Sequence, residues 1–160
     1  MTAADYVALV KAQLKESWLP HIYRERILKT RTRSYHFAEL KKNAPVEIQH
    51  TLLGVELKVG NRRLLCPDLA TARYLSVFAR AGCPDVALPY DITKISQFAD
   101  ELESSWQRML LWADHYASNR SQTLKTRIRG LVIATLRGEI SEAGPGTAAQ
   151  EFKEGTNQRS

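Results

Sequence analysis

The sequence is poor in cysteine and has no long apolar run. Only Cys66 and Cys83 occur in 160 residues, too few for a disulfide framework or a multi-cysteine zinc site. No nearly uncharged run approaches the ~20 residues that span a bilayer. Lys11 interrupts the first apolar stretch, and no small-residue cleavage site follows it, so we expect no signal peptide. These absences predict a cytoplasmic protein with two thiols and no membrane partner.

Several catalytic motifs are also missing from the sequence. It contains no Walker loop, no Gly-x-Gly-x-x-Gly and no Gly-x-Ser-x-Gly, so nucleotide hydrolysis and serine hydrolysis have no support. The histidines lack the short spacing of a metal-binding pair; they are His21, His36, His50 and His115. The leading interpretation therefore includes no metal and no cofactor.

Positive charge, in contrast, is abundant and unevenly distributed. The chain has 23 Lys and Arg against 17 Asp and Glu, a net charge of +6. Residues 11–42 and 120–130 are basic, whereas acidic residues gather in 85–103. Such a separation of charge is typical of proteins that bind a polyanion.

The residue pattern predicts a single α+β domain over 1–140, followed by a flexible tail over 141–160. Apolar spacing predicts helices over 3–18, 68–81, 92–117 and 122–137. Alternation predicts strands over 27–37, 46–53 and 85–90. The clearest local signal is "VELKVGNRRLLC", a 55–66 hairpin around Gly60-Asn61 in which Val59 faces Arg62 and Val55 faces Cys66. We therefore expect a small, mostly antiparallel sheet flanked by helices.

Each cysteine is followed by Pro-Asp, as "CPDLA" at 66–70 and "CPDVA" at 83–87. Residues 62–90 predict a βαβ-like unit, which puts the two cysteines at opposite ends of a helix about 21 Å long. That separation excludes a disulfide or a shared zinc. We interpret the repeat as two element boundaries and expect a buried thiol at Cys66, although a reactive thiol at a helix N-terminus remains the alternative.

The carboxyl edge of such a unit would gather polar residues that could hold a divalent metal or transfer protons. These are Cys66, Asp68, Tyr90, Asp91, Thr93 and Lys94. Helix capping is the alternative role of Asp68 and Asp91, and we favour it.

Glu56 and Lys58 lie two apart on a predicted strand, so their side chains point the same way. This Glu-x-Lys strand resembles the core of the PD-(D/E)xK nucleases, with Glu47 as the nearest upstream acid. The resemblance implies Mg²⁺ held by Glu47 and Glu56, and an attacking water positioned by Lys58. The chain departs from that pattern where a hairpin strand precedes the helix and where glutamate replaces the upstream aspartate. A solvent-facing cross-strand ion pair is the favoured alternative.

The leading interpretation is non-catalytic binding of DNA or RNA through basic side chains, with exposed aromatics stacking on bases. The residues expected to bind are Arg24, Arg26, Lys29, Arg31, Arg33, Tyr35, Lys41, Lys42, Arg127 and Arg129. A further alternative is an interaction module that forms a homo-oligomer through the helix 92–117, where Trp106 and Trp112 point in different directions.

Overall fold

The computed structural model describes residues 1–41 and 43–146 and confirms the α+β class. A helical N-terminal part is followed by strands and then by long helices. The elements are α1 (Ala3–Leu14), the short helices η1 (Lys15–Ser17), α2 (Leu19–Ile22) and η2 (Tyr23–Ile27), β1 (Thr32–His36), β2 (Val46–Thr51), β3 (Gly54–Val59), β4 (Arg62–Cys66), α3 (Leu69–Ala81), β5 (Asp85–Pro89), α4 (Ile92–Tyr116) and α5 (Gln122–Ala143).

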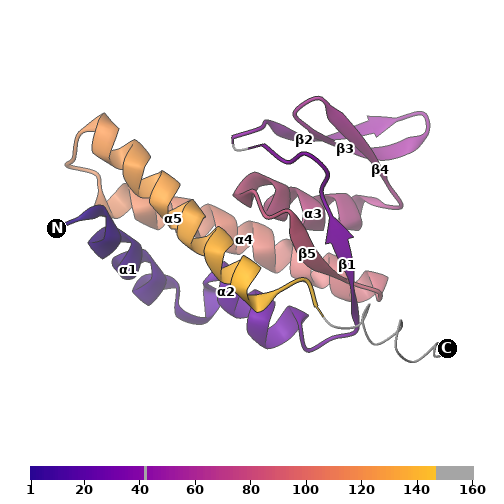
Figure 1. Cartoon of the computed structure of the whole chain (residues 1–160), viewed down its shortest axis with the longest axis horizontal. Helices are drawn as coiled ribbons and strands as arrows, with labels where there is room; N and C mark the ends of the chain where they lie inside the picture. The colour runs from indigo at the N-terminus through magenta and orange to yellow at the C-terminus, as the bar shows by residue number, and fades with distance from the viewer. Residues whose placement is uncertain (42, 147–160) are drawn as a thin grey trace.

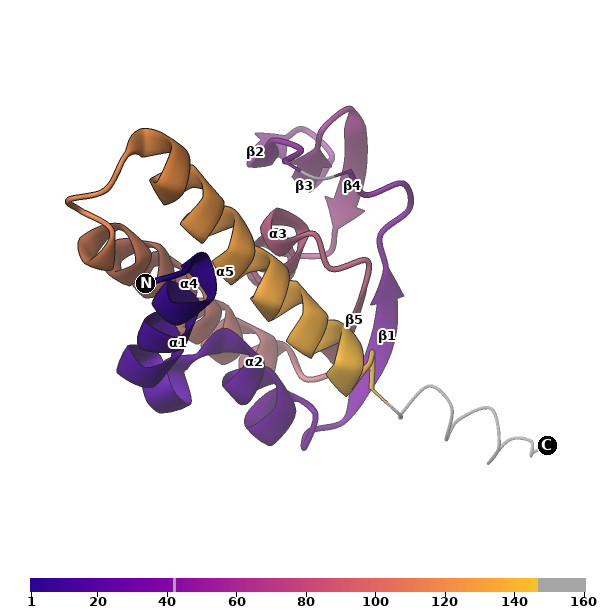
Figure 2. The ribbon, with the colours of Figure 1, turned by 60° about the vertical axis from the view of Figure 1, so that its left-hand side comes forward.

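The helices and the sheets occupy different sides of the molecule. Figure 1 shows α1, α4 and α5 side by side, with α3 between them and the sheet made of β2, β3 and β4. In the turned view of Figure 2, β1 and β5 lie beside the C-terminal end of α5. The chain therefore builds a helical body that carries two small sheets at one side.

The predicted hairpin is confirmed in its register. β3 and β4 pair antiparallel with Val59 opposite Arg62 and Val55 opposite Cys66, and β2 adds the expected third strand. Gly60 has a φ of +60°, which a two-residue hairpin turn requires at its first position. Leu57, in the middle of β3, is fully buried on the face that meets α3.

The predicted βαβ unit is wrong in its pairing, because β4 and β5 belong to different sheets. β5 pairs antiparallel with β1 instead. On its other side, the hydroxyl of Tyr23 accepts the N–H of Ala87 (2.9 Å), and the hydroxyl of Tyr74 donates to the Ala87 carbonyl (2.5 Å). Two tyrosines thus satisfy backbone groups of a buried edge strand that would otherwise need a neighbouring strand.

Predicted boundaries shift at several elements. The first helix, predicted over 3–18, ends at Leu14 and is followed by the short helix η1. Residues 23–27 coil into the π-helix η2, which puts Ile27 into the core, so the strand predicted from 27 begins only at Thr32. The last helix continues to Ala143 rather than ending at 137. Beyond it, the Tyr23 hydroxyl donates to the Gly144 carbonyl (2.5 Å), and Ser34 donates to the Pro145 carbonyl (3.2 Å). The rest of the predicted tail, 147–160, lies outside the described residues.

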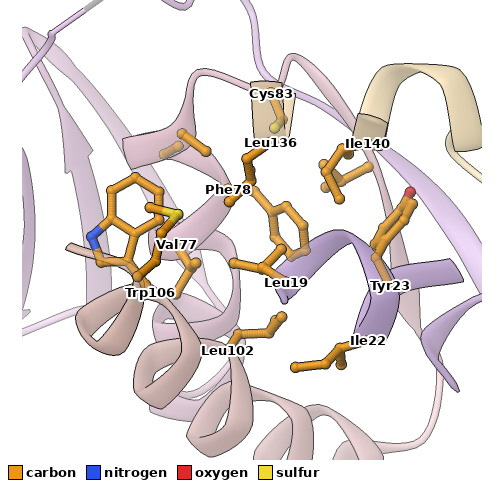
Figure 3. Close-up of a cluster of buried hydrophobic side chains, with 14 of the residues drawn as sticks. Leu19, Ile22, Tyr23, Val77, Phe78, Cys83, Leu102, Trp106, Leu136 and Ile140 are labelled. Atoms are coloured by element: carbon orange, nitrogen blue, oxygen red, sulfur yellow. The ribbon is translucent and has the colours of Figure 1, made fainter. Parts of the chain in front are cut away.

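One cluster of buried side chains joins the helices. In Figure 3, Phe78 of α3 lies among Leu19, Leu102 and Leu136, which come from α2, α4 and α5. Each of these side chains is at most 1% exposed. No helix among the described residues is both long and apolar enough to cross a membrane.

Candidate nucleic-acid interface

The predicted basic residues fall into two groups, and the first group is engaged within the fold. Arg24 and Lys11 both reach Glu139 of α5, at 3.4 and 2.7 Å. Arg26 forms an ion pair with Glu101, and its guanidinium lies 5.4 Å from the centre of the Phe98 ring. These arginines hold the N-terminal helices against α4 and α5, so their charge is largely neutralised where they lie.

The basic residues in and just before the N-terminal half of α5 divide in the same way. Arg129 forms two hydrogen bonds with the Asp114 carboxylate, at 3.0 and 3.2 Å. The guanidinium of Arg120 donates to the Tyr6 hydroxyl at 2.6 Å. Arg127 is exposed, but it lies in the N-terminal half of α5, about 24 Å along the helix axis from the end that meets β1. The structure does not bring the two predicted basic patches together.

The second group surrounds an aromatic ring at the end of β5. The β1–β5 ladder continues past its last assigned pair, since the Tyr90 N–H donates to the Arg31 carbonyl at 3.2 Å. Arg31 thus lies opposite Tyr90, and Arg33 lies two residues further along the same side of β1. Their guanidinium carbons are 4.9 and 5.6 Å from the centre of the Tyr90 ring, which is the geometry of cation–π contacts.

Two lysines lie near these residues in the chain, Lys29 two residues before Arg31 and Lys94 four residues after Tyr90. Lys29 is exposed in the turn before β1, and Lys94 is exposed in the first turn of α4. We call Lys29, Arg31, Arg33, Tyr90 and Lys94 the Tyr90 surface. Within the described parts of the chain, no carboxylate lies at ion-pair distance from Lys29, Arg33 or Lys94.

A shallow hollow of about 370 Å³ opens at the Tyr90 surface. Asp91 contributes the acidic group of its lining, and this carboxylate caps α4 by accepting hydrogen bonds from the Thr93 N–H (2.9 Å) and hydroxyl (2.7 Å). Hydrogen bonds from Thr93, the side-chain one first, hold the pKa of Asp91 below its usual 3.8. The lining consists of Thr30, Arg31, Pro89, Tyr90, Asp91 and Lys94.

The remaining predicted contacts lie elsewhere. Tyr35 is half-buried and packs edge-on against Phe37, with ring centres 5.0 Å apart, so it is a weaker stacking candidate than Tyr90. Lys41 follows β1 in the chain and lines a separate pocket of about 550 Å³ with residues of the β3–β4 hairpin, Lys58 and Arg62 among them. Lys42 lies outside the described residues.

The polar edge expected around Cys66 does not form as a shared parallel edge, because its two strands are in different sheets. Asp68 accepts a hydrogen bond from the Thr71 N–H at 2.7 Å, so the capping role predicted for Asp68 and Asp91 is confirmed. Both cysteines are free thiols and are buried. Burial, and then the charge of Asp68, raise the pKa of Cys66, which argues against a reactive thiolate.

Glu47, Glu56 and Lys58 do share one face of the three-stranded sheet. Glu47 lies opposite Lys58 on the neighbouring strand, and Glu56 lies opposite Gln49. Oε1 of Glu56 is buried without a hydrogen-bond partner among the described residues, and Arg63 approaches this same oxygen to 4.0 Å. No group of three or more His, Cys, Asp or Glu with metal-binding geometry occurs among the described residues. The nuclease alternative therefore stays a prediction.

Tyr90 and Lys94 are the residues of the Tyr90 surface to which the sequence assigned a different role. Both stood in the predicted polar edge, but nothing in the local pattern placed them beside Arg31 and Arg33. That contact depends on the pairing of β1 with β5, across more than 50 residues of chain. No protein family model, no curated protein and no solved structure gives a significant match to this chain.

Proposed function

We propose that this protein binds nucleic acid through the Tyr90 surface, without catalysing a reaction on it. The observation that carries the proposal is the placement of two guanidinium groups over one exposed tyrosine ring. Arginine neutralises phosphates and an exposed ring stacks on bases, so one small area offers both kinds of contact. The buried, unlinked thiols accord with a cytoplasmic location, which belongs to the same proposal.

The ion pairs that other arginines form within the fold support this choice of surface. Arg24, Arg26 and Arg129 are paired with carboxylates, so binding a phosphate there would require breaking an existing ion pair. Arg33 forms no ion pair with the described residues, and the Asp91 carboxylate near Lys94 lies beyond ion-pair distance. A phosphate there would displace no ion pair. The net charge of +6 adds a long-range attraction for any polyanion.

The test measures binding of fluorescent single- and double-stranded DNA and RNA by anisotropy, at ~50 and ~200 mM salt without metal. Three or four phosphate contacts predict an affinity loss of about 20- to 150-fold over that range. The double variant Arg31→Glu/Arg33→Glu should abolish binding at both salt concentrations. Lys125→Glu/Arg127→Glu makes the same change of net charge at the other end of α5. It should weaken binding only slightly at ~50 mM salt and not at ~200 mM, because only the screened long-range attraction changes.

Two results would contradict the proposal. If wild-type protein binds none of the four probes at ~50 mM salt, the Tyr90 surface is not a nucleic-acid interface. If both double variants lose affinity equally, binding depends on net charge and not on this surface.

The same samples examine the nuclease alternative, in whose favour the buried Oε1 of Glu56 accepts no hydrogen bond from the described residues. After addition of Mg²⁺ to the wild-type mixture, the length of each probe is checked on a denaturing gel. Cleavage that Glu56→Gln abolishes would replace the non-catalytic proposal by a metal-dependent nuclease with Glu47, Glu56 and Lys58 at its site. If the probe stays intact, the proposal of binding without catalysis stands.

A further inference from the structure

The Tyr90 side chain is held in place and is partly exposed. It is 42% exposed at the end of β5, while the preceding residue, Pro89, is buried. The backbone bond to Arg31 and the two guanidinium contacts restrict where the ring can point. A preoriented aromatic side chain loses little conformational freedom when a ligand stacks on it.

The area beside the ring suits one nucleotide better than a duplex. The hollow of about 370 Å³ is near the lower end of the roughly 300–1,000 Å³ typical of small-ligand pockets. Thr30 and Lys94 lie on its rim, where they can reach a sugar or a phosphate. A paired base exposes only its edges in the grooves, whereas an unpaired base can present its face to an aromatic ring.

We infer that the Tyr90 surface selects single-stranded nucleic acid, with Tyr90 stacking on one unpaired base while Arg31 and Arg33 hold the adjoining phosphates. This inference rests on the proposed function and adds the substrate class to it. Arginine planes also stack on bases, so the guanidinium groups can contact a base as well as a phosphate. The stacking is independent of base identity, because every base has a π-face.

The experiment compares two ligands with equal charge. One is oligothymidylate of about ten nucleotides, within the ~4–16 nucleotides that single-strand binding modules cover, and the other is an abasic oligomer of the same length. Wild-type protein should bind the thymidylate about tenfold or more tightly than the abasic strand at the same salt, which is the range for one stacked base. Tyr90→Ala should reduce this preference to less than about twofold, and Tyr90→Phe should retain it, because the ring and not the hydroxyl makes the contact.

Tyr116→Ala is the matched aromatic control. Tyr116 ends α4, which is about 37 Å long, and Tyr90 precedes the start of that helix. Replacing Tyr116 by alanine should therefore leave the preference for thymidylate unchanged.

The outcomes separate this inference from the function on which it rests. Equal, salt-sensitive binding of both oligomers by wild-type protein overturns base stacking and leaves phosphate binding standing. That comparison needs no variant, so it holds even if Tyr90→Ala unfolds. A preference that persists in a folded Tyr90→Ala protein overturns the role of Tyr90. Failure of both oligomers to bind overturns the single-strand inference, whereas the proposed function falls only if the RNA and duplex probes also fail to bind.

Discussion

Gly82 shows how one residue joins two helices. It ends α3 in the left-handed conformation, with φ +77°, and an added Cβ would lie 2.9 Å from Nε of Arg137. That Nε donates to the Ala81 carbonyl at 2.8 Å, so Arg137 of α5 caps the end of α3. The position requires glycine both for its backbone conformation and for the space beside it.

Replacing Gly82 by alanine should therefore lower the free energy of unfolding by about 1–3 kcal/mol, the sum of left-handed strain and a weakened cap. Urea denaturation measures the change. Gly130→Ala is the control, because Gly130 is an exposed glycine inside α5 with nothing within 4 Å of an added Cβ. Alanine there should stabilise the protein by up to about 1 kcal/mol. Destabilisation of similar size in both variants would contradict this account of Gly82.

At the scale of elements, Glu139 on α5 fastens the N-terminal helices. Its carboxylate accepts hydrogen bonds from Lys11 at 2.7 Å and from the Trp18 indole at 2.9 Å, and Arg24 lies 3.4 Å away. Burial acts to raise the pKa of Glu139, but the bonds from Lys11 and Trp18 outweigh it, and the pKa falls below its usual 4.5. One carboxylate thus holds α1 and α2 against α5.

Glu139→Gln should lower the free energy of unfolding by about 1–2 kcal/mol at pH 7, because Lys11 and Arg24 lose their counter-charge. The unfolded chain binds a proton at this carboxyl at a higher pH than the folded one. The ionised Glu139 carboxylate therefore gives its full stabilisation above pH 4.5, and this stabilisation is lost as the pH falls below that value. Chemical denaturation at pH 7, 5, 4 and 3 should show the wild-type advantage over Glu139→Gln shrinking toward pH 3. The exposed Glu142, changed to Gln, is the control for the loss of one carboxylate and should change the free energy of unfolding at pH 7 by less than about 0.5 kcal/mol. A wild-type advantage over Glu139→Gln that stays constant from pH 7 to pH 3 would contradict this account of Glu139.

The elements also show which features the sequence could predict. Gly60-Asn61 determines the β3–β4 hairpin within a few residues, so its register was predictable. The partner of β5 was not, because β1 lies some 50 residues earlier and the hydroxyls of Tyr23 and Tyr74 complete the strand from two other helices. Charge pattern found Arg31 and Arg33, yet only this long-range pairing reveals that Tyr90 lies between them and α4.

At the scale of the whole molecule, the fold separates the two basic stretches of the sequence. Arg127 and Arg33 belong to equally basic stretches, but α5 carries the first away from β1 and brings its own C-terminal end to β1. Figure 1 shows the N-terminal end of α5 and the strand β1 on opposite sides of the molecule. A binding surface is therefore narrower than the distribution of lysine and arginine along the chain suggests.

The prediction of a homo-oligomer joined through α4 also becomes more specific at this scale. Trp106 is only 9% exposed and belongs to the core (Figure 3), and Trp112 stacks on Tyr116 with ring centres 5.6 Å apart. The apolar side chain that α4 leaves outside in its C-terminal half is Leu111, which is 67% exposed. Any assembly through this half of α4 would bury Leu111.

Assembly through α4 predicts that light scattering of wild-type protein at high concentration gives about twice the chain mass of 18.1 kDa. Leu111→Glu should then return the mass to that of one chain, because a charge at the centre of an apolar contact is costly to desolvate. Leu53→Glu is the control, since Leu53 is 82% exposed at the turn between β2 and β3 and lies outside α4. A light-scattering mass of one chain for the wild-type protein would contradict assembly through α4. In that case a single chain would form the proposed Tyr90 surface by itself.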